Sequence, residues 1–156
     1  MTARDIMTSQ VMTLPPATAV GVVAKELASR NFSGIPIVDN GKVVGIVTEA
    51  DLVKRVARQG APRPISFTMR DGFLFLADPQ RSSSELGKIL GQPVSTIMSS
   101  PVVAVSPEAG LDEIATVMTE RKINRVVVVE GSKLVGIVTR ANLVKAFAKE
   151  AEKVPA

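Results

Sequence analysis

The sequence predicts one mixed α/β (α+β) domain, built from two copies of a β-α-β-β-α unit packed face to face by pseudo-twofold symmetry. Shifting the 156-residue chain against itself by 91 residues aligns residues 6–57 with residues 97–148 without a gap, with 19 identities in 52 positions. Each copy holds two runs of β-branched residues, typical of strands covered on both faces. Apolar residues make up 46% of the chain, but one copy alone is too small to bury its sheet.

The opening half of each copy predicts a short extended segment followed by a helix. Residues 11–14 in copy one match residues 102–105 in copy two. We expect Pro16 to open the first helix, and Ser106-Pro107 to supply an N-cap and a first-turn proline for its counterpart. One buried face per helix is predicted by apolar residues at helical spacing. They are Val20, Val23, Ala24 and Leu27, matched by Leu111, Ile114, Ala115 and Met118.

The closing half of each copy predicts a strand, a tight turn, a second strand and a helix. Asn40-Gly41 is a strong tight-turn signal between two apolar runs. Met7 and Met98 match across the copies, which favours core packing over metal binding. The expected strands are residues 35–38 and 43–47 in copy one and 126–129 and 134–138 in copy two, with helices at 49–58 and 140–150.

An insertion, residues 58–93, separates copy one (1–57) from copy two (94–150), and residues 151–156 form a tail. The insertion holds three of the five phenylalanines, and residues 73–76 predict a short strand or an apolar plug. Residues 82–85 have capping-box spacing before a short helix that ends near Leu90. Three interpretations stay open: a linker packed across the domain edge, a lid over one cleft, or a contact with a partner.

The composition does not favour an enzyme or a nucleic-acid-binding protein. Histidine and cysteine are absent, which removes the usual general base, thiolate nucleophile and transition-metal ligands. The net charge of +4 is spread along the chain, and no aromatic residues alternate with basic ones. No apolar run is long enough to span a membrane, and the first residues lack the apolar stretch of a signal peptide. We expect a soluble, cytoplasmic protein.

The junction between the last strand and last helix of copy one carries the sharpest local motif. Thr48 stands where the helix N-cap is expected, and Asp51 follows three residues later. One interpretation is a capping box, which explains both residues without a ligand. The other is a ligand site, because helix N-terminal N–H groups and a threonine hydroxyl bind phosphate, while a first-turn carboxylate accepts two ribose hydroxyls.

Four features together resemble a pair of CBS domains, a Bateman module. They are the tandem repeat, the Ile-Met pair near the start of each copy, the strand at residues 35–39, and the Gly-h-x-Thr-x-x-Asp motif (h, apolar) between the last strand and last helix. The resemblance covers both copies and not the insertion. It implies a disc-like module that catalyses nothing, commonly dimerises, and binds AMP, ADP, ATP, NAD or S-adenosylmethionine as a regulatory ligand in its inter-repeat clefts. An unidentified effector protein would receive the signal.

Carried over by position, the resemblance implies a phosphate contact for Thr48 and a ribose contact for Asp51. In copy two Thr139 keeps its place, but Asn142 replaces the acid, so the Asp51 site is expected to bind ribose better. Arg125 stands where some family members hold a phosphate, or it is a solvated residue at a strand start. The adenine wall would come from Ile35, Pro36, Ile37 and Ile46, which could equally be strand core, and Lys122 and Arg140 are weaker basic candidates.

The alternative function is a structural or interaction module. Its clefts would then be vestigial, and the apolar insertion would mediate assembly.

Overall fold

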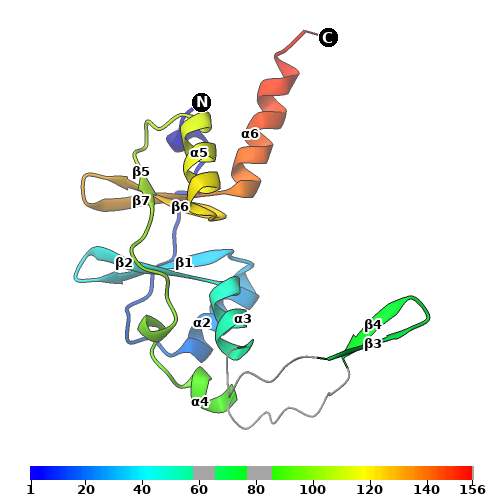
Figure 1. The fold of residues 1–156 in the computed structure, drawn as a ribbon. Helices are drawn as coiled ribbons and strands as arrows, with labels where there is room; N and C mark the ends of the chain where they lie inside the picture. Colours follow the sequence, from blue (N-terminus) through cyan, green and yellow to red (C-terminus); the bar gives the residue numbers. More distant parts are fainter. Residues whose placement is uncertain (58–65, 77–85, 156) are drawn as a thin grey trace.

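The computed structural model describes residues 1–57, 66–76 and 86–155, and confirms the predicted mixed α/β repeat. Two small sheets face each other, with helices on their outer sides (Figure 1). Copy one contains α2 (Val20–Arg30), β1 (Gly34–Asp39), β2 (Lys42–Thr48) and α3 (Glu49–Ala57). Copy two contains β5 (Ala104–Val105), α5 (Leu111–Arg121), β6 (Arg125–Glu130), β7 (Lys133–Thr139) and α6 (Arg140–Glu152).

The two sheets share their pairing down to the position of a bulge. β1 and β2 are antiparallel around Asn40 and Gly41, whose positive φ angles of 50° and 78° match the predicted tight turn. Leu14 adds a parallel bridge to Ile37, where copy two has β5 parallel to β6. The antiparallel register shifts between Ile37 and Val38, and again 91 residues later in β6. The duplication therefore preserves backbone detail as well as the order of elements.

The opening segment of each copy packs on the opposite copy. Thr8 and Ile137 exchange backbone hydrogen bonds of 2.9 and 3.0 Å, and Ser99 and Ile46 exchange bonds of 2.8 and 3.0 Å. The short helix α1 (Ala3–Ile6) therefore lies beside α5 and α6, although it precedes copy one in the chain (Figure 1). The two halves are interlocked because each is completed by a segment of the other.

The helices that follow Pro16 and Ser106-Pro107 begin later than predicted. Both prolines lie in turns, and α2 and α5 start only at Val20 and Leu111. The reason is that carbonyl groups in these turns accept hydrogen bonds from the exchanged segments. The bonds run from Ala3 to Ala109 (2.8 Å), Arg4 to Pro107 (2.9 Å), Val94 to Thr18 (2.7 Å) and Ser95 to Pro16 (3.2 Å).

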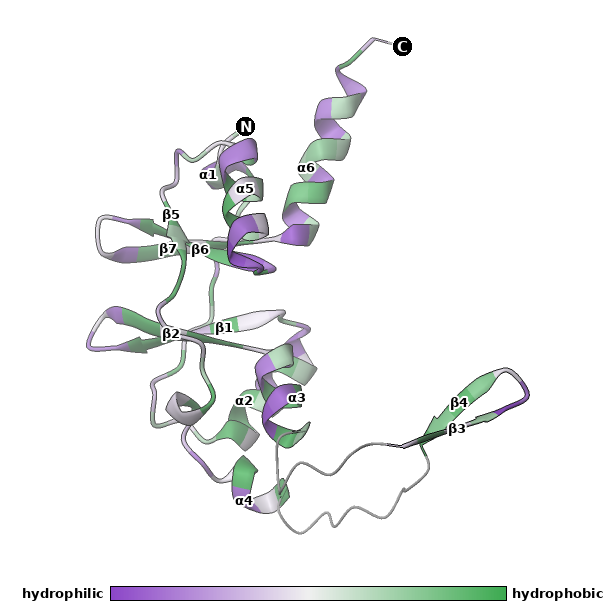
Figure 2. Ribbon diagram, in the orientation of Figure 1, coloured by the Kyte–Doolittle hydropathy of each residue, from purple (hydrophilic) through white to green (hydrophobic). Residues whose placement is uncertain are grey.

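Each half has its own apolar core, and each core includes one residue of the exchanged segment. Ala3 is fully buried in the core of the second half, and Val94 is fully buried in the core of the first. Met7 and Met98 pack against these same two cores, which confirms the predicted role of the matched methionines. Hydrophobic residues are concentrated on the facing strands in Figure 2.

The described part of the insertion contains a hairpin and a helix. β3 (Phe67–Arg70) and β4 (Phe73–Leu76) pair antiparallel, which confirms the strand predicted at 73–76, and every residue of both strands is exposed. α4 (Leu86–Leu90) contacts α2 and is followed by the 3-10 helix η2 (Val94–Thr96). The predicted capping box at 82–85 lies outside the described residues. Within them, no helix combines the length and apolar character needed to cross a membrane.

The contact of each methionine with a glycine of the opposite half predicts a stability effect. A Cβ atom on Gly45 would overlap the Met98 sulfur and lie 3.1 Å from the Ser99 carbonyl oxygen. Gly45→Ala should therefore lower the free energy of unfolding by about 1–3 kcal/mol in urea denaturation. Gly87→Ala is the matched control, because nothing lies within 4 Å of its added Cβ. Equal stability of the two variants would contradict this packing.

Candidate functional site

Thr48 and Asp51 form a reciprocal capping box at the start of α3. The Thr48 backbone N–H and Oγ1 donate to Asp51 Oδ2 at 2.8 and 3.0 Å, and the Asp51 N–H donates to Thr48 Oγ1 at 3.3 Å. The capping interpretation of this motif is therefore present in the structure. Asp51 Oδ1 lies outside the box and accepts a hydrogen bond of 3.0 Å from the exposed Ser99 hydroxyl.

Thr139 and Asn142 build the same box at the start of α6. The Thr139 N–H and Oγ1 donate to Asn142 Oδ1 at 2.8 and 3.0 Å, and the Asn142 N–H donates to Thr139 Oγ1 at 3.2 Å. The carbonyl expected to accept a ribose hydroxyl is therefore already engaged. Because an amide has one oxygen, the group in the place of Asp51 Oδ1 is the Nδ2 donor. The two helix starts are alike, but their remaining polar atoms are an acceptor in copy one and a donor in copy two.

Arg125 begins β6 in copy two, and its side chain lies near α3 of copy one. Burial lowers the pKa of the Arg125 guanidinium, and the nearby carboxylates of Asp51 and Glu49 offset part of this effect. Its Nε is buried and has no hydrogen-bond partner among the residues that the structure describes. A partly desolvated cation from one half therefore faces the carboxylate and helix start of the other. We call Thr48, Asp51, Ser99 and Arg125 the Asp51 site.

A cavity of about 380 Å³ opens beside the box of copy two, and we call it the Asn142 cleft. It lies between the halves, because residues of α6 and β7 face the loop before β1 of copy one. Gly34, the first residue of β1, also lines the cleft and corresponds to Arg125 under the 91-residue shift. Among the described residues that line it, none is acidic and Lys145 alone is charged. The lining residues are Thr8, Gln10, Val11, Met12, Asn31, Phe32, Ser33, Gly34, Ile137, Thr139, Ala141, Asn142 and Lys145.

The residues expected to wall an adenine lie in the two strands of copy one. Ile35 and Ile37 are fully buried in the core of the first half, Pro36 is buried between them, and Ile46 pairs with Ser99 through its backbone. The strand-core interpretation describes their place in this structure, and their contact with an adenine stays a prediction. The weaker basic candidates are not at the Asp51 box. Lys122 and Arg140 line a separate cavity of about 380 Å³ in the second half, where Arg140 donates to Asn124 Oδ1 at 3.0 Å.

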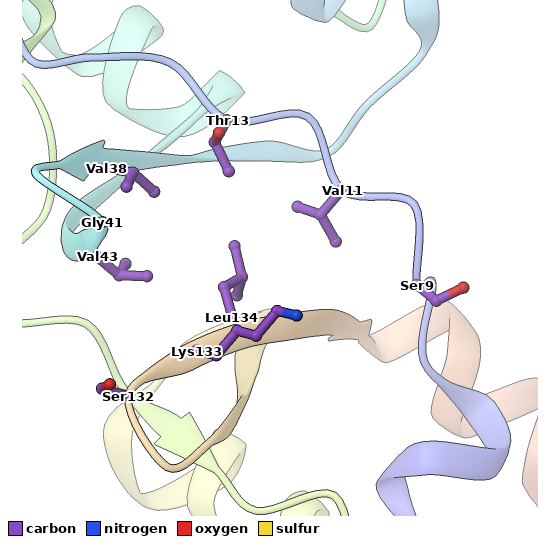
Figure 3. A pocket seen from close by; sticks show the side chains of 9 residues that line it. All are labelled: Ser9, Val11, Thr13, Val38, Gly41, Val43, Ser132, Lys133 and Leu134. Atoms are coloured by element: carbon purple, nitrogen blue, oxygen red, sulfur yellow. The ribbon is translucent and has the colours of Figure 1, made fainter.

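A pair of cavities lies toward the strand turns, between the two sheets. Figure 3 shows the smaller one, of about 340 Å³, with Val11 and Leu134 pointing into it from opposite halves. Its counterpart of about 630 Å³ is lined by the equivalent segments, among them Ser100, Val102 and Ala104. Neither cavity includes the Thr-x-x-Asp or Thr-x-x-Asn residues among its lining. The repeat therefore creates two related cavities between the sheets.

Sequence reasoning missed Gly34, Asn31, Ser33 and Gln10 as lining residues, and Ser99 as a partner of Asp51. A signal for Gly34 was available, because applying the 91-residue shift to Arg125 leads directly to it. The positions of Asn31, Ser33, Gln10 and Ser99 depend on how the two halves are oriented relative to each other. The sequence indicates that two copies pack together, but it does not say that each strand-helix junction faces the opposite copy.

The chain belongs to the CBS domain family. The family model matches residues 3–58 and 94–149, which are the two halves of the internal repeat. Together with the pseudo-symmetric fold, this match confirms the resemblance noted in the sequence and the expected disc-like module.

Similar proteins include the CBS domain-containing protein YhcV of Bacillus subtilis, which is 29% identical over 140 residues, covering 90% of this chain and 81% of that protein. An uncharacterized protein of Methanocaldococcus jannaschii, MJ1404, is 33% identical over 144 residues, but the chain (92% covered) spans only 31% of its length. The crystal structure of CBSX2 in complex with AMP has a TM-score of 0.69 and 26% identity, and covers 96% of this chain and 98% of that one.

The matched capping boxes predict matched contributions to stability. Thr48→Ala and Thr139→Ala each remove the hydroxyl that accepts from the third helical N–H, so each should cost about 0.5–2 kcal/mol in chemical denaturation. Thr119→Ala is a control, because that hydroxyl donates only to the carbonyl one turn earlier on an exposed helix face. The box has no stabilising role if Thr48→Ala unfolds at the same urea concentration as Thr119→Ala.

Proposed function

We propose that this protein is a regulatory module that binds an adenosine-containing ligand between its two CBS repeats and catalyses no reaction itself. The observation that carries the proposal is the Asp51 site. It combines a helix N-terminus, a carboxylate oxygen outside the capping box, and a guanidinium whose buried Nε lacks a partner among the described residues. These groups suit a phosphate and a ribose held side by side.

The groups of the Asp51 site differ in how far their present contacts leave them available to a ligand. Asp51 Oδ1 is bonded only to the exposed Ser99 hydroxyl among the described residues, and a ribose hydroxyl can replace that donor without breaking the capping box. The first N–H groups of α3 favour an anion at the helix start. The Thr48 hydroxyl donates its one proton to Asp51 Oδ2, so a phosphate contact from it requires that bond to break. Arg125 would supply the charge-assisted hydrogen bonds to a phosphate.

Relatives support the choice of ligand class. CBSX2, which shares the fold and 26% identity, was crystallised with AMP. AMP is therefore the first ligand to test, followed by ADP, ATP, NAD and S-adenosylmethionine. No catalytic cofactor is part of the proposal.

Binding should depend more on Asp51 than on Asn142. We expect Asp51→Ala to weaken AMP binding about tenfold or more in isothermal titration calorimetry, because it removes the charged acceptor for ribose. Asn142→Ala is the matched control, since it also breaks one capping box but removes no carboxylate. Thermal unfolding of both variants checks that they are folded. The proposal fails if no adenosine compound at millimolar concentration raises the melting temperature of the wild-type protein.

A second function, assembly without ligand binding, is favoured by one observation. The β3–β4 hairpin exposes large apolar side chains on both strands, and a two-stranded hairpin is only marginally stable by itself. Apolar side chains are also exposed on α3 and α6, at the matched positions Val53 and Val144 and at Val56 and Phe147. We infer that the protein forms a homodimer through these exposed side chains of α3 and α6.

Light scattering after size-exclusion chromatography distinguishes the two surfaces. Val144→Asp with Phe147→Asp should convert the dimer to a monomer, because both charges would be buried in the interface. Deleting residues 67–76 should leave the dimer intact. If the deletion abolishes the dimer, the double Asp variant keeps it and AMP does not bind, the results support assembly through the insertion.

A further inference from the structure

The pseudo-twofold axis passes close to Gly34 and Arg125. These positions are equivalent under the 91-residue shift, and they pair in register with the equivalent residues Thr48 and Thr139. They also touch each other across the interface. A Cβ atom on Gly34 would lie 2.9 Å from Arg125 Cδ and 3.4 Å from its Nε. Two equivalent residues in contact must lie near the axis, and this contact leaves room for one large side chain only.

The one large side chain serves a single site. Arg125 extends over Gly34 toward Glu49 and Asp51, so its cation lies at the start of α3. The start of α6 faces Gly34 instead, which has no side chain to offer. An arginine guanidinium can hold a phosphate with two hydrogen bonds, and partial desolvation strengthens that interaction. The Asp51 site therefore has a specific group for a phosphate that the Asn142 cleft lacks.

The remaining polar groups of the Asn142 cleft are mostly uncharged. Its lining includes the amides of Gln10, Asn31 and Asn142, which suit hydroxyls and the edge of a base. Lys145 does not distinguish the two sites, because the repeat places Lys54 at the same position on α3. The volume of about 380 Å³ lies within the range of small-molecule sites, about 300–1,000 Å³.

We propose that the two sites take ligands of different charge. The Asp51 site binds an adenosine ligand that carries a phosphate, and the Asn142 cleft binds an adenosine ligand without one. This inference rests on the proposed function. One module would then sense two chemical classes at once, and the difference arises from a single pair of residues at the axis.

The test compares AMP with adenosine by calorimetry, with each site isolated in turn. Asn142→Ala leaves the Asp51 site intact, and there AMP should bind about 10- to 100-fold tighter than adenosine. Adding Arg125→Met to the Asn142→Ala variant should bring the AMP and adenosine affinities within about threefold of each other. Adenosine affinity should be retained, because methionine keeps an apolar side chain in the place of the arginine stem and removes only the charge. In Asp51→Ala, the Asn142 cleft should bind adenosine at least as tightly as AMP.

Two further measurements keep the test independent of folding. Arg125→Lys retains the charge and should keep most of the preference for AMP, which a purely structural role of Arg125 would not predict. In wild-type protein, raising the salt concentration should weaken AMP binding and leave adenosine binding unchanged. Equal preference for AMP at both sites overturns the inference and leaves the proposed function standing. Absence of binding by either compound to wild-type protein overturns the proposed function as well.

Discussion

The architecture depends on backbone pairing between the opening segment of each repeat and the second strand of the other. Thr8 pairs with Ile137 and Ser99 with Ile46, so each sheet is extended by a residue from the opposite copy. In the same segments, the side chains of Met7 and Met98 pack against Gly136 and Gly45. A side chain on either glycine would overlap the methionine. Each core is completed from the other half, and the halves cannot separate without exposing both cores.

This exchange also brings the two halves together at the candidate sites. Ser99 holds the second strand of copy one through its backbone and the Asp51 carboxylate through its hydroxyl. The residue that locks the fold therefore also contacts the residue proposed to bind ribose. From Ser99 the chain leads back through η2 to α4, which packs against α2. One hydrogen bond thus joins Asp51 to the segment that follows the insertion.

Local features of the fold were predictable from the sequence, and features that depend on the exchange were not. The strands, the Asn40-Gly41 turn and the Thr-x-x-Asp box follow from short-range chemistry that the sequence displays directly. Pro16 misled the prediction of helix starts, because its carbonyl is taken by a segment about eighty residues away in the chain. Ile35 shows the same limit at the site: a β-branched run identifies a strand, but not which of its faces meets the opposite half.

The pseudo-twofold symmetry explains why Arg125 and Gly34, which are equivalent positions, hold residues of different size. A duplicated chain can keep the same residue at equivalent positions, as it does at Thr48 and Thr139 and at Lys54 and Lys145. At the axis itself a residue meets its own counterpart, and two arginines there would compete for one space and repel each other. A large residue at one position therefore favours a small one at the other, as Arg125 over Gly34 shows. The difference between Arg125 and Gly34 at the axis therefore adds to the difference between Asp51 and Asn142 at the two helix starts.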